Sequence, residues 1–427
     1  MSLLSSRRFL PLFITQFFGA FNDNLLKNSL VMLVTYRLSA QTGGNAQLLV
    51  TLAAGLFMLP FFLFSATAGQ LADKYDRAKL SRIVKLVEIA LMVIAAVGFF
   101  AHSPYFLLFV LFCMGVQATF FGPIKYALLP QHLHDDELLL GNAYIESGTF
   151  LAILLGTIIG GLLILQPGGE GWVSAAMVLF AVLGYLASRF IPGAPAPDPT
   201  LTVNRNIWRE TWRIVGFSRE NKAVFICILG ISWFWLVGAT FLSQFPGYAK
   251  DVIHSDETVV TLFLTVFSVG IGVGSMLCSK LLGGHIRTTY VPLAALGMTL
   301  FSFDIYIASL HPSQGDSAAL IDAWHFMTSW NSWRIMGDLF LIAVSGGVYI
   351  VPLYAIMQHQ SAPQHRARII AANNVINALF MVAAAVLTLA MLAMAFTIPQ
   401  VFLAVALANG VVAVVCYKVN RQTSSCA

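Results

Sequence analysis

Residues 69–79 read GQLADKYDRAK and place five charged side chains in a short stretch. On either side lie apolar runs, at about 46–70 and 79–101, that are each longer than the ~18 residues that suggest a membrane-spanning helix. The charged stretch therefore has to lie at a membrane surface, between two helices that cross the bilayer. This pattern predicts a polytopic membrane protein.

The composition of the whole chain gives the same prediction. Its 427 residues are 58% hydrophobic and 10% charged, with a mean hydropathy of +0.80, whereas soluble domains carry about 25% charged residues. The apolar runs do not alternate with polar residues, which favours helices over a β-barrel. The net charge of +5 comes from short loops, so no nucleic-acid partner is expected. The five cysteines are scattered and show no disulfide or metal-binding pattern.

The hydropathy pattern predicts an all-α protein with twelve transmembrane helices. The first run carries charge in its middle and lacks a small-residue cleavage site, so we expect a span and not a signal peptide. The predicted spans are 9–36, 46–70, 79–101, 104–129, 138–165, 171–191, 222–247, 257–282, 289–309, 335–357, 369–393 and 397–417.

The Lys and Arg residues predict the orientation of these spans. If the N-terminus lies in the cytoplasm, most of the 24 basic residues fall in cytoplasmic segments. The exceptions are Arg37, Lys250 and Arg334 on the outer side and Lys27 within a span. The positive-inside rule then predicts that both termini are cytoplasmic.

A linker divides the predicted spans into two sets of six. Residues 192–221 begin with the proline-rich PGAPAPDPT and continue as NRNIWRETWRIVGF, which has the pattern of an amphipathic helix at the membrane surface. We therefore expect an N-terminal half at 1–191, a cytoplasmic linker at 192–221 and a C-terminal half at 222–427.

A weak internal repeat supports two related halves. The stretch LGNAYIESGTFLAILLG in span five resembles AANNVINALFMVAAA in span eleven. Asn142 matches Asn373 and Glu146 matches Asn377 at the same offset. Parallel repeats of this kind relate the halves of some transporters.

The opening stretch resembles the signature G-x-x-x-D-R/K-x-G-R-K/R of the major facilitator superfamily. Asp76 stands where the family usually has glycine. The resemblance implies the major facilitator fold, with twelve helices in two six-helix halves. An aspartate at such a junction can accept hydrogen bonds at a neighbouring helix N-terminus. The residues expected to form a conformational latch are Gly69, Asp73 and Arg77.

Four further stretches resemble the bacterial lysophospholipid transporter family. They are AFNDN (20–24), GPIKYALLP (122–130), GNAYIESGTFLAILLG (141–156) and VPLYAIMQ (351–358). The resemblance implies a bacterial inner-membrane protein that carries lysophospholipid to the inner leaflet, with an acyltransferase and an acyl-activating enzyme as partners. It also implies a basic residue in span seven, where this chain has GATFLSQF (238–245).

The first span carries the main candidate site. Gln16, Asp23 and Lys27 follow helical steps, with Asn24 on the adjoining flank, and Asp23 lies near the bilayer midplane. A charge at that depth costs several kcal/mol against lipid, so this stripe has to face the protein interior. It is either part of a substrate cavity or an Asp23–Lys27 pair that neutralises itself.

Other charged residues lie within the later spans. Lys125 and Glu146 form a second candidate set, because Glu146 is deep enough to need a cation such as Lys125 or Lys27. Glu88 and Asp304 have no evident partner, and for both we favour a structural or interfacial role over substrate binding.

Two features near the outer side complete the candidates. Asp338 lies one turn from Arg334 and is expected to pair with it at the outer rim or to form a gate contact. His311 and Asp316 have the H-x-x-x-x-D spacing of acyltransferases, but no α/β domain accompanies them. We therefore expect neither an enzyme nor a cofactor.

The aromatic run ISWFWLVGATFLSQFP (231–246) is open to two interpretations: a cavity wall for an acyl chain, or packing against lipid. The leading functional hypothesis is an alternating-access transporter of lysophospholipid, most simply lysophosphatidylethanolamine. The alternative is a proton-driven exporter of drugs or siderophores, with Asp23 or Glu146 as the titrating acid.

Overall fold

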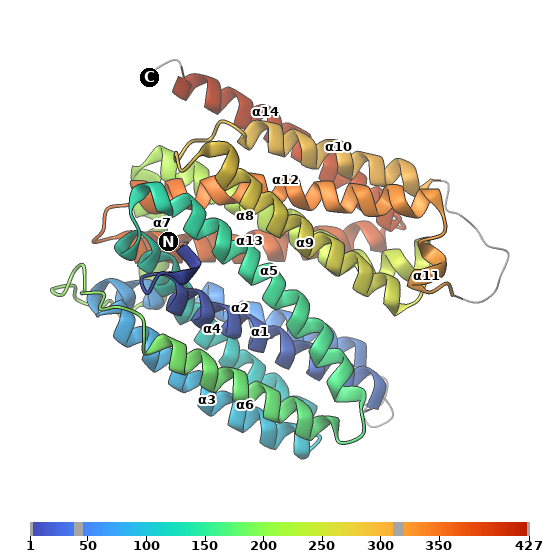
Figure 1. Cartoon of the computed structure of the whole chain (residues 1–427), viewed down its shortest axis with the longest axis horizontal. Coiled ribbons are helices and arrows are strands. Elements are labelled where there is room, and N and C mark those ends of the chain that lie inside the picture. The colour runs from blue at the N-terminus through green and yellow to red at the C-terminus, as the bar shows by residue number, and fades with distance from the viewer. Residues whose placement is uncertain (1–2, 38–45, 311–319, 425–427) are drawn as a thin grey trace. The chain divides into compact units, whose positions relative to one another are not determined.

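The computed structural model describes residues 3–37, 46–310 and 320–424, with the side chains of 46–48 and 422–424 left undescribed. In these ranges it is built from helices (Figure 1). The long helices are α1 (Leu10–Met32), α2 (Ala46–Lys74), α3 (Arg77–Phe100), α4 (Pro104–His132), α5 (Asp135–Leu165), α6 (Gly169–Ser188), α8 (Lys222–Gly247), α9 (Glu257–Leu282), α10 (Val291–Ser309), α12 (Trp330–Gln360), α13 (Arg366–Ala393) and α14 (Ile398–Ser424).

Short elements connect some of the long helices. The linker contains α7 (Ile207–Glu220), and α11 (Ala323–Phe326) precedes α12. The remaining short turns are η1 (Leu3–Ser5), η2 (Leu33–Arg37) and η3 (Tyr248–Val252).

Of the described helices, eleven are long and apolar enough to cross a membrane, and they correspond to predicted spans two to twelve. The first predicted span is α1, which has 23 residues and at ~1.5 Å per residue is also long enough. It is less apolar than the others because it carries Asp23, Lys27 and several amides. The prediction of an all-helical polytopic membrane protein is confirmed.

Side-chain caps explain where several helices begin. Asp76 accepts a hydrogen bond from the Lys79 N–H (2.9 Å) and so caps α3. The aspartate that stands where the superfamily signature has glycine therefore acts as a helix N-cap. Asn206 caps α7 in the same way. Asp322 caps α11, where the hydrogen bond from the His325 N–H holds the pKa of its carboxyl below the usual range.

The described chain forms two compact units. Unit 1 comprises 1–141, 151–226 and 357–378, and unit 2 comprises 142–150, 227–356 and 379–427. The bounds divide four helices between the units, namely α5, α8, α12 and α13. The predicted boundaries of the halves, at 191 and 222, stay a prediction.

Close helix contacts through glycine build the core of unit 1. A Cβ at Gly156 or Gly160 of α5 would meet backbone carbonyl oxygens of α1, and one at Gly115 of α4 would meet the Phe57 carbonyl of α2. Small residues permit such close approach between membrane helices. The space between helices is then filled by apolar side chains such as Leu25, Met92 and Leu111.

Unit 2 combines close helix contacts with aromatic packing. Gly274 of α9 and Gly347 of α12 lie against each other's helix backbone. Phe241 of α8 stacks on Phe402 of α14, with ring centroids 4.4 Å apart, and Tyr248 packs edge-on against Phe402. Aromatic pairs of this geometry add to the free energy of apolar burial.

Candidate functional site

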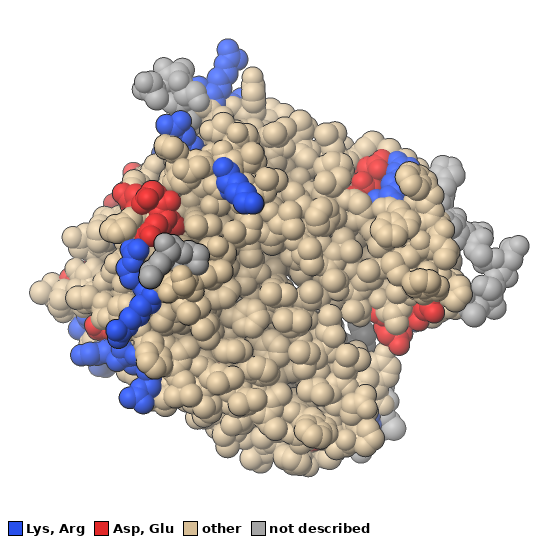
Figure 2. All heavy atoms as spheres, in the orientation of Figure 1, with Lys and Arg blue, Asp and Glu red and all other residues tan. Residues whose placement is uncertain are grey.

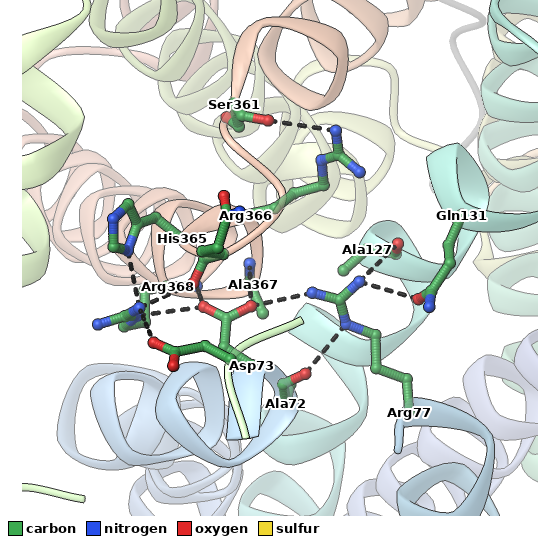
Figure 3. A network of polar contacts seen from close by, with 12 residues as sticks. Ala72, Asp73, Arg77, Ala127, Gln131, Ser361, His365, Arg366, Ala367 and Arg368 are labelled. Carbon is green, nitrogen blue, oxygen red and sulfur yellow. Dashed lines mark hydrogen bonds and ion pairs between the residues drawn. The ribbon is translucent and has the colours of Figure 1, made fainter. Parts of the chain in front are cut away.

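On the face that Figure 2 draws, most of the visible Lys and Arg side chains gather toward the left side. The predicted latch residues Gly69, Asp73 and Arg77 are buried in unit 1. The Asp73 carboxylate, at the end of α2, accepts hydrogen bonds from the backbone N–H groups of Ala367 (3.1 Å) and Arg368 (3.2 Å). These N–H groups lie in the first turn of α13, where a helix has no internal acceptors for them. Asp73 therefore caps α13 from a neighbouring helix (Figure 3).

Two arginines bind the same carboxylate. Arg77 Nη2 lies 2.9 Å from Asp73 Oδ1, and Arg368 Nε lies 3.1 Å from Oδ2. All three side chains are buried. Arg77 also donates to the carbonyl oxygens of Ala72 and Ala127, so it ties the end of α2 to α4. A carboxylate with four donors satisfies the demand that a buried charge be paired and hydrogen-bonded.

The linker takes part in this junction. The Arg77 N–H donates to the Ala194 carbonyl (3.0 Å), and the Asp198 N–H donates to the Asp73 carbonyl (3.0 Å). The Asp198 carboxylate also lies 3.5 Å from Arg368 Nη2. The proline-rich segment is thus held against the α2–α3 turn by its backbone.

Gly69 permits the contact between α2 and α13. A Cβ at this position would lie 2.7 Å from the Ala371 Cβ and 2.9 Å from the Arg368 Cα. Any larger residue would push the first turn of α13 away from Asp73. The structure thus brings Gly69, Asp73 and Arg77 together, and their action as a latch stays a prediction.

A second polar cluster lies inside unit 1, and the sequence did not reveal it. Lys85 Nζ is 2.6 Å from Glu88 Oε2 within α3, and both side chains are fully buried. Glu88 also accepts hydrogen bonds from Asn22 of α1 (3.1 Å) and Gln117 of α4 (3.0 Å). The prediction that Glu88 has no close partner is therefore wrong. The only sequence signal was the i, i+3 spacing of Lys85 and Glu88.

Glycines make room for the Lys85 ammonium. A Cβ at Gly19 of α1 would lie 2.7 Å from Lys85 Nζ, and one at Gly184 of α6 would lie 3.4 Å from it. The Phe121 ring covers another side, with its centroid 5.3 Å away. The ammonium is thus enclosed by α1, α4 and α6 as well as by its own helix.

Asp23 and Lys27 lie beside this cluster but do not bind each other. Among the ion pairs of the described residues, none joins these two side chains. Lys27 Nζ instead lies 5.9 Å from the centroid of the Phe57 ring, and Asp23 Oδ1 is buried without a hydrogen-bond partner. The i, i+4 spacing allowed a pair, but Lys27 is directed toward α2.

The other predicted site residues lie in different surroundings. Gln16 and Asn24 are buried in α1, where Asn24 donates to the Ala20 carbonyl of its own helix (2.8 Å). Lys125 Nζ lies 4.7 Å from the centroid of the Tyr126 ring. Glu146 is buried in the piece of α5 that belongs to unit 2, and its pairing with Lys125 or Lys27 stays a prediction.

In unit 2, Arg334 binds Asp304 instead of its helical neighbour Asp338. Arg334 Nε lies 2.9 Å from Asp304 Oδ2, and Nη2 lies 2.5 Å from Oδ1. The planar guanidinium thus forms a fork on a carboxylate of α10. The prediction of an Arg334–Asp338 pair and of a partnerless Asp304 is wrong.

Two tryptophans in the aromatic run of α8 direct their indole N–H groups toward other helices of unit 2. Trp233 Nε1 donates to Asn409 Oδ1 (2.7 Å), and Trp235 Nε1 donates to the Tyr354 hydroxyl (3.2 Å). Phe150 of α5 stacks on Trp235, with ring centroids 6.1 Å apart. These contacts direct both indoles toward other helices of unit 2, and a cavity wall for an acyl chain stays a prediction.

Two other expectations concern chemistry. His311 and Asp316 lie outside the described residues. Within the ranges that the structure describes, no group of three His, Cys, Asp or Glu side chains could hold a metal ion.

Comparisons with known proteins agree with this architecture. Residues 12–321 match the family model of the major facilitator superfamily. The chain is 23% identical over 366 residues to the lysophospholipid transporter LplT of Serratia proteamaculans, covering 84% of this chain and 82% of that protein. It is 25% identical over 367 residues to the LplT of Enterobacter sp. strain 638, covering 79% and 82%.

Solved structures show the same fold. The human organic anion transporter MFSD10 aligns with a TM-score of 0.74 at 13% identity, over 96% of this chain and 99% of that one. A bacterial homologue of the iron transporter ferroportin, in its outward-facing state, aligns with a TM-score of 0.65 at 15% identity, over 96% and 99%. With more than half of its length matched by the family model, this multi-pass membrane protein belongs to the major facilitator superfamily.

Proposed function

We propose that this transporter carries lysophospholipid, with lysophosphatidylethanolamine as the simplest substrate, from the outer to the inner leaflet of a bacterial inner membrane. The likeness to lysophospholipid transporters supports the substrate class. The proposal includes cytoplasmic termini and a cytoplasmic acyltransferase with an acyl-activating enzyme that re-acylates the imported lipid. Membrane lipids surround the protein throughout.

The observation that carries the proposal is the state of Asp23 and Lys27. Both lie near the middle of α1 and are not paired with each other, and Asp23 Oδ1 is buried without a hydrogen bond. Charged side chains at mid-membrane are costly, and the residues that persist there usually mark a functional site. An ethanolamine headgroup offers an ammonium for Asp23 and a phosphate for Lys27. Gln16, Asn24, Lys125 and Glu146 are the further residues we propose for the substrate site.

Alternating access requires a contact that forms in one state and opens in another. We propose that the Asp73 junction with Gly69, Arg77 and the first turn of α13 is this contact. The Asp73 carboxylate accepts hydrogen bonds from four donors in two other segments. When this contact opens, the carboxylate loses these donors and has to be hydrated.

The test is uptake and binding of lysophosphatidylethanolamine by purified protein in vesicles, for Asp23→Asn, Lys27→Met and the double variant. Each single change should reduce binding by at least about ten-fold, because one charge contact to the headgroup is lost. The double variant should stay inactive. Asp322→Asn is the control, because it removes an exposed carboxylate while keeping a side chain that caps α11.

Recovery of transport in the double variant would mean that Asp23 and Lys27 only neutralise each other. Normal lysolipid re-acylation in a strain that lacks the protein, together with new sensitivity to drugs or loss of siderophore export, would favour a proton-driven exporter.

A further inference from the structure

The linker helix α7 has two faces of different character. Glu210, Thr211, Ile214 and Ser218 are buried, at steps that place them on one side of the helix. The opposite side exposes large aromatic surfaces, with Trp212 74% accessible. Trp208, one turn away on the same side, is 60% accessible, and exposed apolar patches of this kind mark interaction surfaces.

The buried face fixes how α7 is oriented on unit 1. Ile214 packs in a cluster with Ala66 of α2 and with Ala371 and Val375 of α13. At the start of the helix, the Asn204 N–H donates to Gln70 Oε1 of α2 (2.7 Å). The helix therefore cannot turn its tryptophans inward without breaking these contacts.

The exposed face carries unneutralised positive charge. Arg205, Arg209 and Arg219 are exposed, and within the described part of the chain no acidic side chain pairs with them. Arg213 is the exception, since Nη1 lies 3.7 Å from Glu210 Oε2. A partner for this face should therefore carry negative charge.

The place of α7 in the chain puts it at the membrane surface. It ends at Glu220, and α8, a candidate span, begins at Lys222, so a single residue separates the two helices. Tryptophan prefers the headgroup region of a bilayer, and arginine binds phosphate through two parallel hydrogen bonds. The two tryptophans favour a lipid over free phosphate, which offers no apolar contact.

We propose that α7 binds anionic phospholipid headgroups through Trp208, Trp212 and the neighbouring arginines, and that this binding stabilises the contact between Asp73 and the first turn of α13.

The link to that contact passes through Phe217. Its ring lies beneath the Arg368 guanidinium, with the centroid 5.6 Å away, and stacks on the His365 ring at 5.2 Å. His365 Nδ1 in turn lies 2.7 Å from Arg368 Nη2. A lipid that holds α7 against the bilayer keeps Phe217 under Arg368, and thereby keeps Arg368 aligned with Asp73.

The experiment measures hydrogen–deuterium exchange of the full chain in nanodiscs of phosphatidylcholine, with and without phosphatidylglycerol. In the wild type, peptides from α7 and from 366–372 should exchange more slowly with the anionic lipid, by about ten-fold in α7. Arg205→Gln/Arg209→Gln should remove the slowing in both segments. Lys280→Gln/Arg287→Gln removes the same amount of charge at exposed positions outside the linker, and this variant should keep the slowing.

Equal exchange in the two lipid mixtures would overturn the proposal, as would slowing that survives the Arg205→Gln/Arg209→Gln change. Inorganic phosphate added to phosphatidylcholine nanodiscs should have no effect, and equal slowing by it would show that a lipid is not the ligand. Slowing in α7 without slowing at 366–372 would disprove the link to Asp73.

Discussion

Unit 1 and unit 2 both bury polar side chains between membrane helices, but they satisfy them in different ways. In unit 1, Lys85 and Glu88 form an ion pair to which Asn22 and Gln117 add hydrogen bonds. In unit 2, the comparable cluster is neutral: Asn409 accepts from Trp233 (2.7 Å) and donates to the Ala295 carbonyl (2.7 Å).

The difference predicts how each unit responds to damage. Removing one partner of a buried ion pair leaves an uncompensated charge, which costs about 3–5 kcal/mol. Removing one hydrogen bond between membrane helices costs about 0.6 kcal/mol on average. The Lys85–Glu88 cluster of unit 1 should therefore be sensitive to single polar substitutions that the Asn409 cluster of unit 2 tolerates.

The largest effect is expected for Glu88→Gln. The change preserves shape but leaves the Lys85 ammonium buried without a counter-charge, so the free energy of unfolding should fall by about 3–5 kcal/mol. Thermal unfolding of the purified protein in detergent measures this loss. The double variant Lys85→Met/Glu88→Leu should regain most of it, because no charge stays buried. A double variant less stable than Glu88→Gln would show that the pair itself stabilises the unit.

An intermediate effect is expected for Gly19→Ala. The new Cβ would displace Lys85 Nζ from its place beside Glu88, and overpacking of this kind costs about 1–3 kcal/mol. Gly238→Ala in unit 2 is the matched control, because nothing lies within 4 Å of a Cβ there. The control should be neutral or slightly stabilising in the same unfolding assay. If both variants lost the same free energy of unfolding, the close contact between Gly19 and Lys85 would not be the cause of the loss.

The smallest effect is expected for Trp233→Phe in unit 2. It removes the hydrogen bond to Asn409 and keeps an aromatic ring, so the loss should be about 0.6 kcal/mol, and at most about 1.7. Asn409 keeps its two donor contacts, to the Ala295 carbonyl and to Thr299. A loss as large as that of Glu88→Gln would contradict the contrast between the two units.

The sequence was sufficient for the fold because hydropathy acts over whole helices. The sequence predicted only part of the Asp73 junction. Asp73 and Gly69 indicated a contact between helices, but only the structure shows that the partner helix is α13. Lys85 was missed because its surroundings come from three other helices, and the run KLVE holds no information about Asn22 or Gln117.

The wrong prediction for Arg334 has a clear physical cause. Arg334 and Asp338 are four apart in sequence, yet Arg334 binds Asp304 across the gap between α12 and α10. Asp23 and Lys27 have the same spacing and also do not bind each other. On an isolated helix such neighbours stabilise each other by only about 0.2–0.5 kcal/mol. Contacts with an adjacent helix readily exceed that amount, so spacing alone is a weak guide inside a bundle.

The backbone contacts of the linker limit where this polypeptide can be divided. A connection between two sets of spans is an obvious place to cut a transporter for co-expression of its parts, or to insert a reporter domain. Here, however, Ala194 and Asp198 contribute backbone groups to the Asp73 junction, and Pro195 accepts a hydrogen bond from Gln131. A break within 194–198 would therefore remove part of that junction. Insertion at the exposed Thr202 leaves these bonds in place, so the tolerance of this linker should change sharply over a few residues.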